Sequence, residues 1–136
     1  MNNCLMNKQF FAFSSPIESF FKISGDDVCL YWKNRQSQFY GADDFLASFA
    51  GFTTQSIIDK TDYDMTLHTQ AADLIVANDQ KIIQQACTKM FLESIDGFKS
   101  HPKPVTALSL KAPLYDSRGD IAGVFGISYT LTSDHP

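Results

Sequence analysis

Cysteine and tryptophan are scarce in this sequence, and long hydrophobic runs are absent. Its 136 residues contain one Trp and three Cys, at positions 4, 29 and 87, with no Cys-x-x-Cys pair. An odd number of widely spaced cysteines argues against a disulfide framework and suits free thiols in a reducing compartment. The apolar run at residues 10–13 is too short for the core of a signal peptide, and no run approaches the length of a membrane span. The sequence therefore predicts a cytoplasmic protein.

A basic surface stripe is missing as well. Eleven Lys and Arg stand against fifteen Asp and Glu, which gives a formal net charge of -4. Direct binding of nucleic acid is therefore not expected. With 44% hydrophobic and 19% charged residues, the composition is that of a globular chain long enough to bury one core. We expect a flexible arm at residues 1–14, one domain at residues 15–132 and a tail at residues 133–136.

Residue clusters that perform catalysis or bind metal are also missing. Ser19 and Lys22 fit a bare Ser-x-x-Lys pattern, but the partner motifs of that enzyme class are absent, so we interpret them as part of a helix face. The three histidines, at positions 68, 101 and 135, have no neighbour at the spacing of zinc ligands. Asp62, Asp64, Asp73 and Asp79 could suggest acid–base chemistry, but a helix cap at Asp62 or Asp64 is the favoured interpretation. The sequence predicts no catalytic residue, no metal site and no enzymatic activity.

Apolar periodicity divides the chain into helices and strands. Ser15 and Pro16 begin an amphipathic helix that ends at Gly25. A short helix capped by Asp43 or Asp44 ends at Gly51. The sequence further predicts one or two helical turns within residues 53–64, a long helix at residues 66–87, and strands at residues 27–34, 38–40, 89–95, 105–115 and 121–131.

The order of these elements predicts an antiparallel α+β domain. Two strands, a run of helices and three strands follow the first helix, so the helices are expected on one face of the sheet with a pocket between the layers. Gly119 allows a turn between the last two strands. Gly123 and Gly126 remove side chains either where a helix or ligand approaches the sheet or only to relieve crowding against helices.

Several motifs follow one another in an order typical of a known family. They are Tyr31-Trp32-Lys33-Asn34, Phe39-Tyr40-Gly41-Ala42-Asp43, Lys60-Thr61-Asp62-Tyr63-Asp64-Met65, the pair Asn78-Asp79, and the closing pattern from Lys111-x-Pro113-Leu114-x-Asp116 through Gly119 and Gly123 to Gly126-Ile127-Ser128. In these motifs the chain resembles the PAS sensor domain family, in particular the branch found in bacterial signalling proteins. The resemblance covers about residues 17–132.

The resemblance implies a PAS fold and a regulatory function. A five-stranded antiparallel sheet would carry short helices and one long helix on one face, and the N-terminal amphipathic helix would be additional. The domain would bind a small, mostly apolar ligand or a protein partner and relay a conformational change to an output domain. That output, in cis or in trans, would be a kinase, a cyclic-dinucleotide enzyme or a DNA-binding domain. The residues Thr130-Leu131-Thr132 depart from the family pattern at the point where the output is usually joined.

Pocket residues are predicted from side chains that could converge from the sheet and the helices. They are Trp32, Tyr40, Phe45, Phe49, Leu74, Asn78, Met90, Leu108, Leu110, Phe125 and Ile127. Asn78, on an apolar helical stripe, either ties the long helix to the preceding loop or offers hydrogen bonds to a ligand.

No cofactor is identified by the sequence. Haem-binding relatives use a His on or near the long helix, which makes His68 a candidate, but a surface or capping role is favoured. Flavin is disfavoured because no Cys lies in the segment by which flavin-binding relatives form their adduct.

A second hypothesis is a ligand-free PAS module for dimerisation or interaction. Its interior would be solid, and its contacts would come from the outer sheet face and the N-terminal helix. The candidate interface residues are Ile17, Phe20 and Phe21, and a homodimer is expected in either case.

Overall fold

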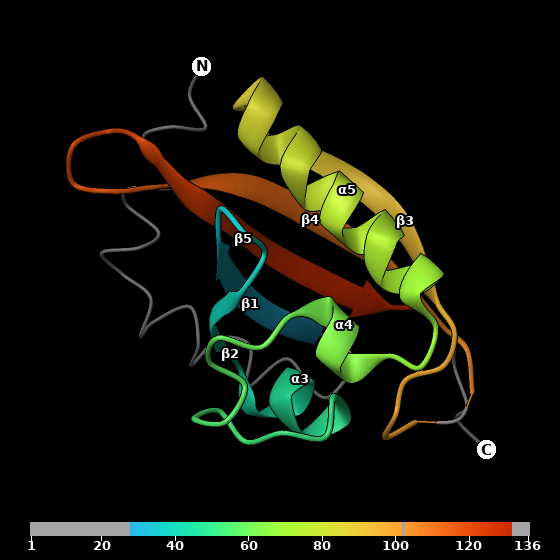
Figure 1. Cartoon of the computed structure of the whole chain (residues 1–136). Helices are drawn as coiled ribbons and strands as arrows, with labels where there is room; N and C mark the ends of the chain where they lie inside the picture. The colour runs from blue at the N-terminus through green and yellow to red at the C-terminus, as the bar shows by residue number, and fades with distance from the viewer. Residues whose placement is uncertain (1–27, 102, 132–136) are drawn as a thin grey trace.

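The computed structural model describes residues 28–101 and 103–131, which form a five-stranded antiparallel sheet with helices on one face (Figure 1). The sheet order is β2-β1-β5-β4-β3. The strands are β1 (Val28–Asn34), β2 (Phe39–Ala42), β3 (Lys89–Ile95), β4 (Val105–Tyr115) and β5 (Ile121–Thr130). The helices are α3 (Asp44–Phe49), α4 (Asp62–Met65) and α5 (Thr69–Gln85). The predicted α+β class and the five strands are confirmed, while the predicted helix at residues 15–24 lies outside the described residues.

The hairpin of β4 and β5 forms the long centre of the sheet. Its turn is closed by Asp116, whose Oδ1 accepts hydrogen bonds from the backbone N–H groups of Arg118 and Asp120. Gly119 has φ +87°, a conformation that glycine adopts without strain. β5 also pairs with β1 along the whole of that strand, which closes the two halves of the chain into one sheet.

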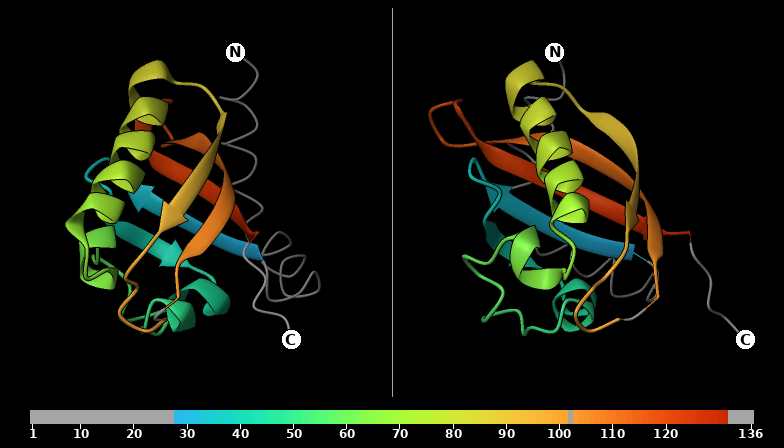
Figure 2. Two further views of the ribbon diagram at one scale, coloured as in Figure 1. Left: turned by 90° about the vertical axis from the view of Figure 1, so that its right-hand side faces the viewer. Right: turned by 45° about the vertical axis from the view of Figure 1, so that its right-hand side comes forward.

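Helix α5 crosses the sheet and contacts β3, β4 and β5 (Figure 2). Its apolar stripe includes Ala72, Ile75 and Ile82, spaced by three or seven residues, and Ile82 packs against Val124 of β5. The helix ends at Ala86, which adopts a left-handed conformation with φ 51°. We call the sheet face under α5 the inner face and the opposite one the outer face.

The long helix predicted at residues 66–87 begins later, at Thr69. Thr66 has extended backbone angles and forms an isolated β-bridge with Phe98, so it separates α4 from α5. In the capping box of α4, the Thr61 N–H donates to Asp64 Oδ2 at 2.8 Å. The predicted capping role of Asp64 is confirmed, whereas Asp62 is buried and points elsewhere.

Helix α3 lies at the β1–β2 end of the inner face. Its N-cap is Asp43, whose Oδ1 accepts a hydrogen bond from the Leu46 N–H at 2.8 Å and whose Oδ2 accepts one from the Leu30 N–H at 2.9 Å. The Asp43 carboxylate therefore caps the N-terminus of α3 and also connects this helix to β1. Of the two caps that the sequence allowed, the structure has Asp43.

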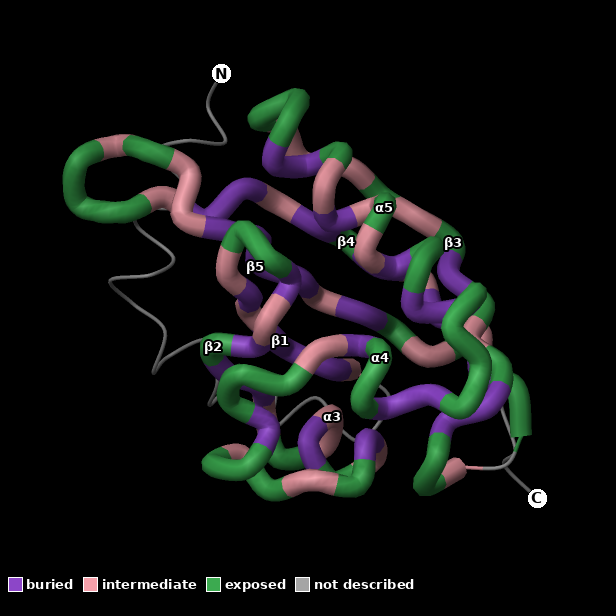
Figure 3. Tube along the Cα trace, viewed as in Figure 1, coloured by how far each residue is buried: buried purple, intermediate pink, exposed green. Residues whose placement is uncertain are grey.

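Most of the core lies between the sheet and α3 and α4, and buried residues follow the central strands (Figure 3). Tyr31, Phe39, Ile57, Met65 and Phe98 belong to this cluster. A second apolar cluster, built on Leu30, Leu114 and Phe125, lies on the outer face. No helix within the described ranges is both long and apolar enough to cross a membrane.

Candidate functional site

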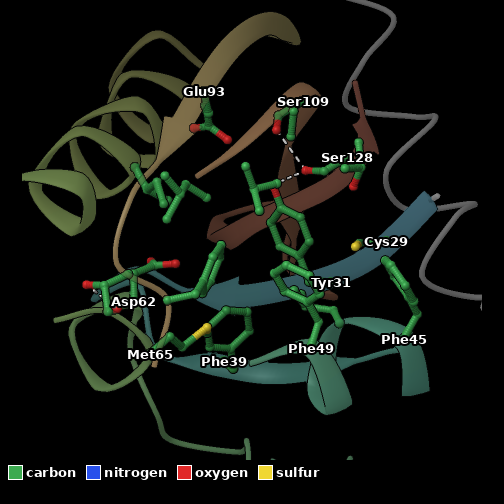
Figure 4. A pocket seen from close by; sticks show the side chains of 18 of the residues that line it. Cys29, Tyr31, Phe39, Phe45, Phe49, Asp62, Met65, Glu93, Ser109 and Ser128 are labelled. Atoms are coloured by element: carbon green, nitrogen blue, oxygen red, sulfur yellow. Dashed lines mark hydrogen bonds between the residues drawn. The ribbon is translucent and has the colours of Figure 1, made fainter. Parts of the chain in front are cut away.

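A cavity of about 70 Å³ lies between the inner sheet face and the helices α3 and α4 (Figure 4). Most of its wall is apolar. The apolar lining consists of Tyr31, Phe39, Phe45, Leu46, Phe49, Met65, Ile75, Ile95, Phe98, Val105 and Ala107. A space with such a lining is suited to a small apolar molecule.

Strand alternation selects the residues that face this cavity. Side chains on one face of a strand recur every second residue, so Cys29, Tyr31 and Lys33 of β1 point inward while Leu30 and Trp32 point outward. The lining residues of the other strands obey the same period of two. They are Glu93 and Ile95 of β3, Val105, Ala107 and Ser109 of β4, and Ser128 and Thr130 of β5.

Gly126 leaves space for the central aromatic ring of the cavity. It pairs with Tyr31, and a Cβ atom at this position would lie 2.2 Å from the Tyr31 ring. A Cβ at Gly123 would lie 1.8 Å from the backbone oxygen of Lys33. Both glycines therefore relieve crowding against β1, whereas the sequence interpretations had placed a helix or a ligand there.

Hydroxyl groups form a polar part of the cavity wall. The Oγ atoms of Ser109 and Ser128 are 2.7 Å apart, and Ser128 Oγ donates to the Tyr31 hydroxyl at 3.2 Å. Figure 4 shows this chain of hydroxyls and the Glu93 carboxylate on the side of the cavity away from Phe39 and Met65. The cavity thus has a polar wall and an apolar one.

Five charged side chains form a buried cluster beside the cavity. Lys33 Nζ lies 2.7 Å from Asp62 Oδ2 and 2.9 Å from Asp79 Oδ2. Lys111 Nζ lies 2.7 Å from Asp79 Oδ1 and 2.9 Å from Glu93 Oε2. Each is almost or wholly buried. Because each ammonium has two carboxylate partners, the cluster satisfies the condition under which buried charges are tolerated.

The surroundings of the carboxyl groups shift their pKa values in opposite directions. Burial tends to raise the pKa of Asp79, but the ammonium groups of Lys33 and Lys111 lower it below its usual range. Burial raises the pKa of Asp62, and the single ammonium of Lys33 does not offset this. For Lys33, burial lowers the pKa but Asp62 and Asp79 raise it further, so it stays charged. Of these two aspartates, Asp62 is therefore the one whose pKa favours the protonated form.

The structure brings two of the eleven predicted pocket residues into the cavity wall, Phe45 and Phe49 of α3. Trp32 and Tyr40 line a separate, open hollow at the other side of the sheet. The remaining strand residues Met90, Leu108, Leu110, Phe125 and Ile127 point to the outer face, because each alternates with an inward-facing neighbour. The prediction that these side chains converge on the pocket was wrong. In each strand the inward position is one residue away, and a shift of one residue moves a side chain to the other face of the sheet.

The two helical candidates have other positions. Leu74 is 64% exposed and points away from the sheet. Asn78 Nδ2 donates to Glu93 Oε2 at 2.9 Å, so its amide ties α5 to β3. The amide therefore ties the helix to the strand that follows it, and not to the preceding loop as the sequence suggested.

The cofactor candidates lie outside the cavity wall or are unreactive. His68 is the N-cap residue of α5, and its ring covers Gly97 rather than the cavity. Burial raises the pKa of the Cys29 thiol, and the nearby Asp43 raises it further, which keeps it protonated. Among the described residues, no group of three or more His, Cys, Asp or Glu could hold a metal ion.

Sequence reasoning missed the buried charges. Lys33 was taken as the end of the apolar part of β1, and Asp62 as a helix cap. A signal was present, because Lys33 and Lys111 stand at inward positions of strands that are otherwise apolar there, and Asp79 interrupts the apolar stripe of α5. Charges of opposite sign at such positions indicate a paired interior cluster.

Solved structures with the same fold include PAS domains of bacterial regulators. The Vibrio cholerae protein VqmA in a complex with ligand and DNA aligns with a TM-score of 0.70 and 20% identity. The alignment covers 85% of this chain and 51% of VqmA, so the chain spans about half of that protein.

Two further structures extend this likeness. The PAS domain of Bordetella pertussis BvgS aligns with a TM-score of 0.63 and 14% identity, covering 85% of this chain and 87% of that one. The PAS domain of a LuxR-family regulator from Burkholderia thailandensis, in complex with ethanol, aligns with a TM-score of 0.57 and 9% identity, covering 78% and 90%.

The family comparison covers most of the sequence. No curated protein matches the chain. The model of the family described as PAS fold matches residues 24–136. The chain therefore belongs to the PAS fold family, as the sequence motifs predicted.

Proposed function

We propose that this domain is the sensor of a signalling protein and that it binds a small, mostly apolar molecule in the cavity between the sheet, α3 and α4. The observation that carries this proposal is the internal cavity of about 70 Å³ with one polar and one apolar wall. A domain of this size normally fills its interior to the density of an organic crystal, so a cavity of that volume is a feature that needs a reason. Binding is the reason we propose.

Similar structures support a sensory role. VqmA is described bound to DPO, and the Burkholderia domain is in complex with ethanol, a molecule on the scale of this cavity. We propose that the bound molecule shifts the packing of α3, α4 and α5 and that an output domain in cis or in trans reads this shift. A DNA-binding domain or a kinase is the kind of output we expect.

The test is to fill the cavity and leave the rest of the sheet unchanged. Ala107 lines the cavity, whereas Ala112 of the same strand faces outward opposite Phe125. In Ala107→Leu the added carbon atoms occupy the cavity, and Ala112→Leu makes the same change on the other face.

Native mass spectrometry after incubation with a small-molecule extract of bacterial cells is the measurement. We expect wild type and Ala112→Leu to carry the same added mass and Ala107→Leu to carry none, with circular dichroism showing that all three are folded. Equal added mass on Ala107→Leu and wild type would place binding outside the cavity. No added mass on any of the three would count against sensing of a metabolite.

A second candidate function is self-association through the outer face. Met90 is 60% exposed, Leu92 is 68% exposed, and both pair with outward-facing leucines of β4, so the β3–β4–β5 part of this face carries an apolar patch. Apolar patches of this kind often mark interfaces between proteins. The predicted interface residues Ile17, Phe20 and Phe21 lie outside the described residues and remain candidates for the same dimer.

Light scattering tests this second function. Leu92→Asp should shift a dimer toward monomer, and Leu74→Asp, at a similarly exposed position on the opposite side of the molecule, should not. A dimer that survives Leu92→Asp excludes the patch as its interface.

A further inference from the structure

The three hydroxyl groups in the cavity wall have one more proton to donate than the hydrogen bonds between them require. Ser109, Ser128 and Tyr31 are joined by two hydrogen bonds, and each hydroxyl has one proton to donate. Because Ser128 donates to Tyr31, Ser109 donates to Ser128, and the proton of the Tyr31 hydroxyl is left over. Reversing the chain would only move the spare proton to Ser109. The wall therefore offers one hydrogen-bond donor to the cavity.

The neighbouring carboxylate has a spare acceptor. Glu93 Oε2 accepts a hydrogen bond from Asn78 Nδ2 at 2.9 Å and lies 2.9 Å from Lys111 Nζ in a salt bridge. In residues 28–101 and 103–131, no side chain or backbone group donates to its other oxygen, Oε1. Glu93 lines the cavity, and its Oε1 is not one of the fully buried unpaired atoms, so a donor supplied by a ligand can reach it.

Donor and acceptor lie on adjacent strands of the same face. Glu93 pairs with Ala107, and Ser109 is the next inward residue along β4. Figure 4 shows the Glu93 carboxylate beside the two serine hydroxyls, with Phe39 and Met65 across the cavity. A molecule held there would meet a carboxylate and a hydroxyl on one edge and hydrocarbon on the other.

We propose that the cavity selects small uncharged molecules that carry a hydrogen-bond donor and an acceptor side by side, such as a primary amide. The donor faces Glu93, and the acceptor faces the spare hydroxyl of the Ser109–Ser128–Tyr31 chain. This inference rests on the proposed function and specifies its ligand.

The charges around the cavity favour an uncharged ligand. Glu93 is already neutralised by Lys111, and Lys33 lies in the cavity wall as well, so an added cation would be repelled by two ammonium groups. An anion would meet Glu93 and Asp62, which also line the cavity. An amide satisfies both spare groups and brings no charge into the interior.

The volume limits the size of the ligand. An engineered cavity of about 150 Å³ holds benzene. The present cavity of about 70 Å³ is half that size. Scaled from the six carbon atoms of benzene, it should accept about three non-hydrogen atoms without movement of its walls, and about four with a small displacement of its lining side chains.

Small molecules of the same shape but different hydrogen-bonding groups or charge test this selectivity directly. Acetamide and acetone are planar and have the same shape, but acetone lacks the donor. Acetamidinium and acetate have the same shape again and carry a positive or a negative charge. Binding of each to the 136-residue chain can be followed by ¹H–¹⁵N NMR titration at millimolar concentrations.

We expect acetamide to bind about tenfold more tightly than acetone, because one hydrogen bond to a charged group is worth at least that factor. Neither ion should compete. Equal binding of acetamide and acetone, or tightest binding of acetamidinium or acetate, would overturn the proposal.

A single substitution tests the role of Glu93. In Glu93→Gln the amide oxygen can accept from Asn78 and Lys111, and the NH₂ group then faces the cavity as a donor. The tenfold preference for acetamide should fall to about one or reverse. Asp120→Asn, the same chemical change at an exposed position in the β4–β5 turn, should keep the preference.

The outcomes separate this inference from the proposed function. Acetone binding that Ala107→Leu abolishes, without a preference for acetamide, keeps the cavity as a binding site and refutes the polar selection. An unchanged preference in Glu93→Gln refutes the role of Glu93 alone. If no isostere perturbs the spectrum of the wild-type chain, both the inference and the proposed function fail.

Discussion

Removal of the Asp79 carboxylate tests whether the buried ion cluster holds the helices on the sheet. Asp79 of α5 is fully buried and accepts from Lys33 of β1 at 2.9 Å and from Lys111 of β4 at 2.7 Å. It is the residue through which the two ammonium groups are joined. In Asp79→Ala each ammonium keeps one carboxylate partner, and α5 loses both of its ionic contacts to β1 and β4.

The magnitude follows from the two lost hydrogen bonds. A hydrogen bond to a charged group contributes about 1.5–3 kcal/mol, so two contribute about 3–6 kcal/mol. Breaking a buried ion pair by removal of one partner costs about 3–5 kcal/mol. We therefore expect a loss of about 4 kcal/mol. With an unfolding entropy of about 2.1 cal/mol/K per residue over roughly 110 residues, this lowers the melting temperature by about 15–20 °C.

Urea unfolding and thermal melting followed by circular dichroism are the assays. Asp73→Ala is the matched control, because Asp73 lies on the same helix but is exposed, where it accepts from the Tyr63 hydroxyl. The control should cost less than about 1 kcal/mol. A loss below about 1 kcal/mol in Asp79→Ala would refute the reasoning, because it would mean that the two ammonium groups find water when the carboxylate is gone.

Two further predictions concern the neighbours of this cluster. A carboxyl group whose pKa is raised by burial holds its proton more tightly in the folded state, so the stability it contributes is present at low pH and is lost as the pH rises through the folded-state pKa. Wild type should thus lose stability relative to Asp62→Asn in thermal melts as the pH increases above about 4, and a difference that does not change with pH would contradict this. Gly126→Ala should cost about 1–3 kcal/mol in urea unfolding, because the new methyl group displaces the Tyr31 ring. A cost near zero would show that the ring moves freely.

The elements of the fold were predictable because each depends on local signals. The predicted strands match β1, β3, β4 and β5 within one or two residues. The predicted helix that begins at Pro16 and ends at Gly25 lies outside the described residues. Runs of β-branched and aromatic residues bounded by turn signals determine such strands with little tertiary context. Thr66 was the exception, since its extended conformation depends on a bridge to Phe98, far along the chain.

The direction of the side chains was harder to predict than the strands that carry them. Both faces of β1 and β5 are buried and apolar, so alternation of polar and apolar residues does not distinguish them. The inward direction predicted for Trp32 and Phe125 was assumed from the pattern of the strands. They lie on the outer face, and the inward positions of β5 are Val124, Gly126 and Ser128.

The inward polar and charged residues give a rule that distinguishes the inner face of the sheet from the outer face. Ser109, Lys111 and Ser128 are buried in strands that are otherwise apolar, and a buried polar group is found where it has a partner. Two apolar faces look alike in the sequence, but only one of them contains groups that need hydrogen bonds, and those groups must face others like them. The face with Lys33, Ser109, Lys111 and Ser128 is therefore the one that meets the helix with Asp79, and this assignment follows from the sequence once burial of both faces is assumed.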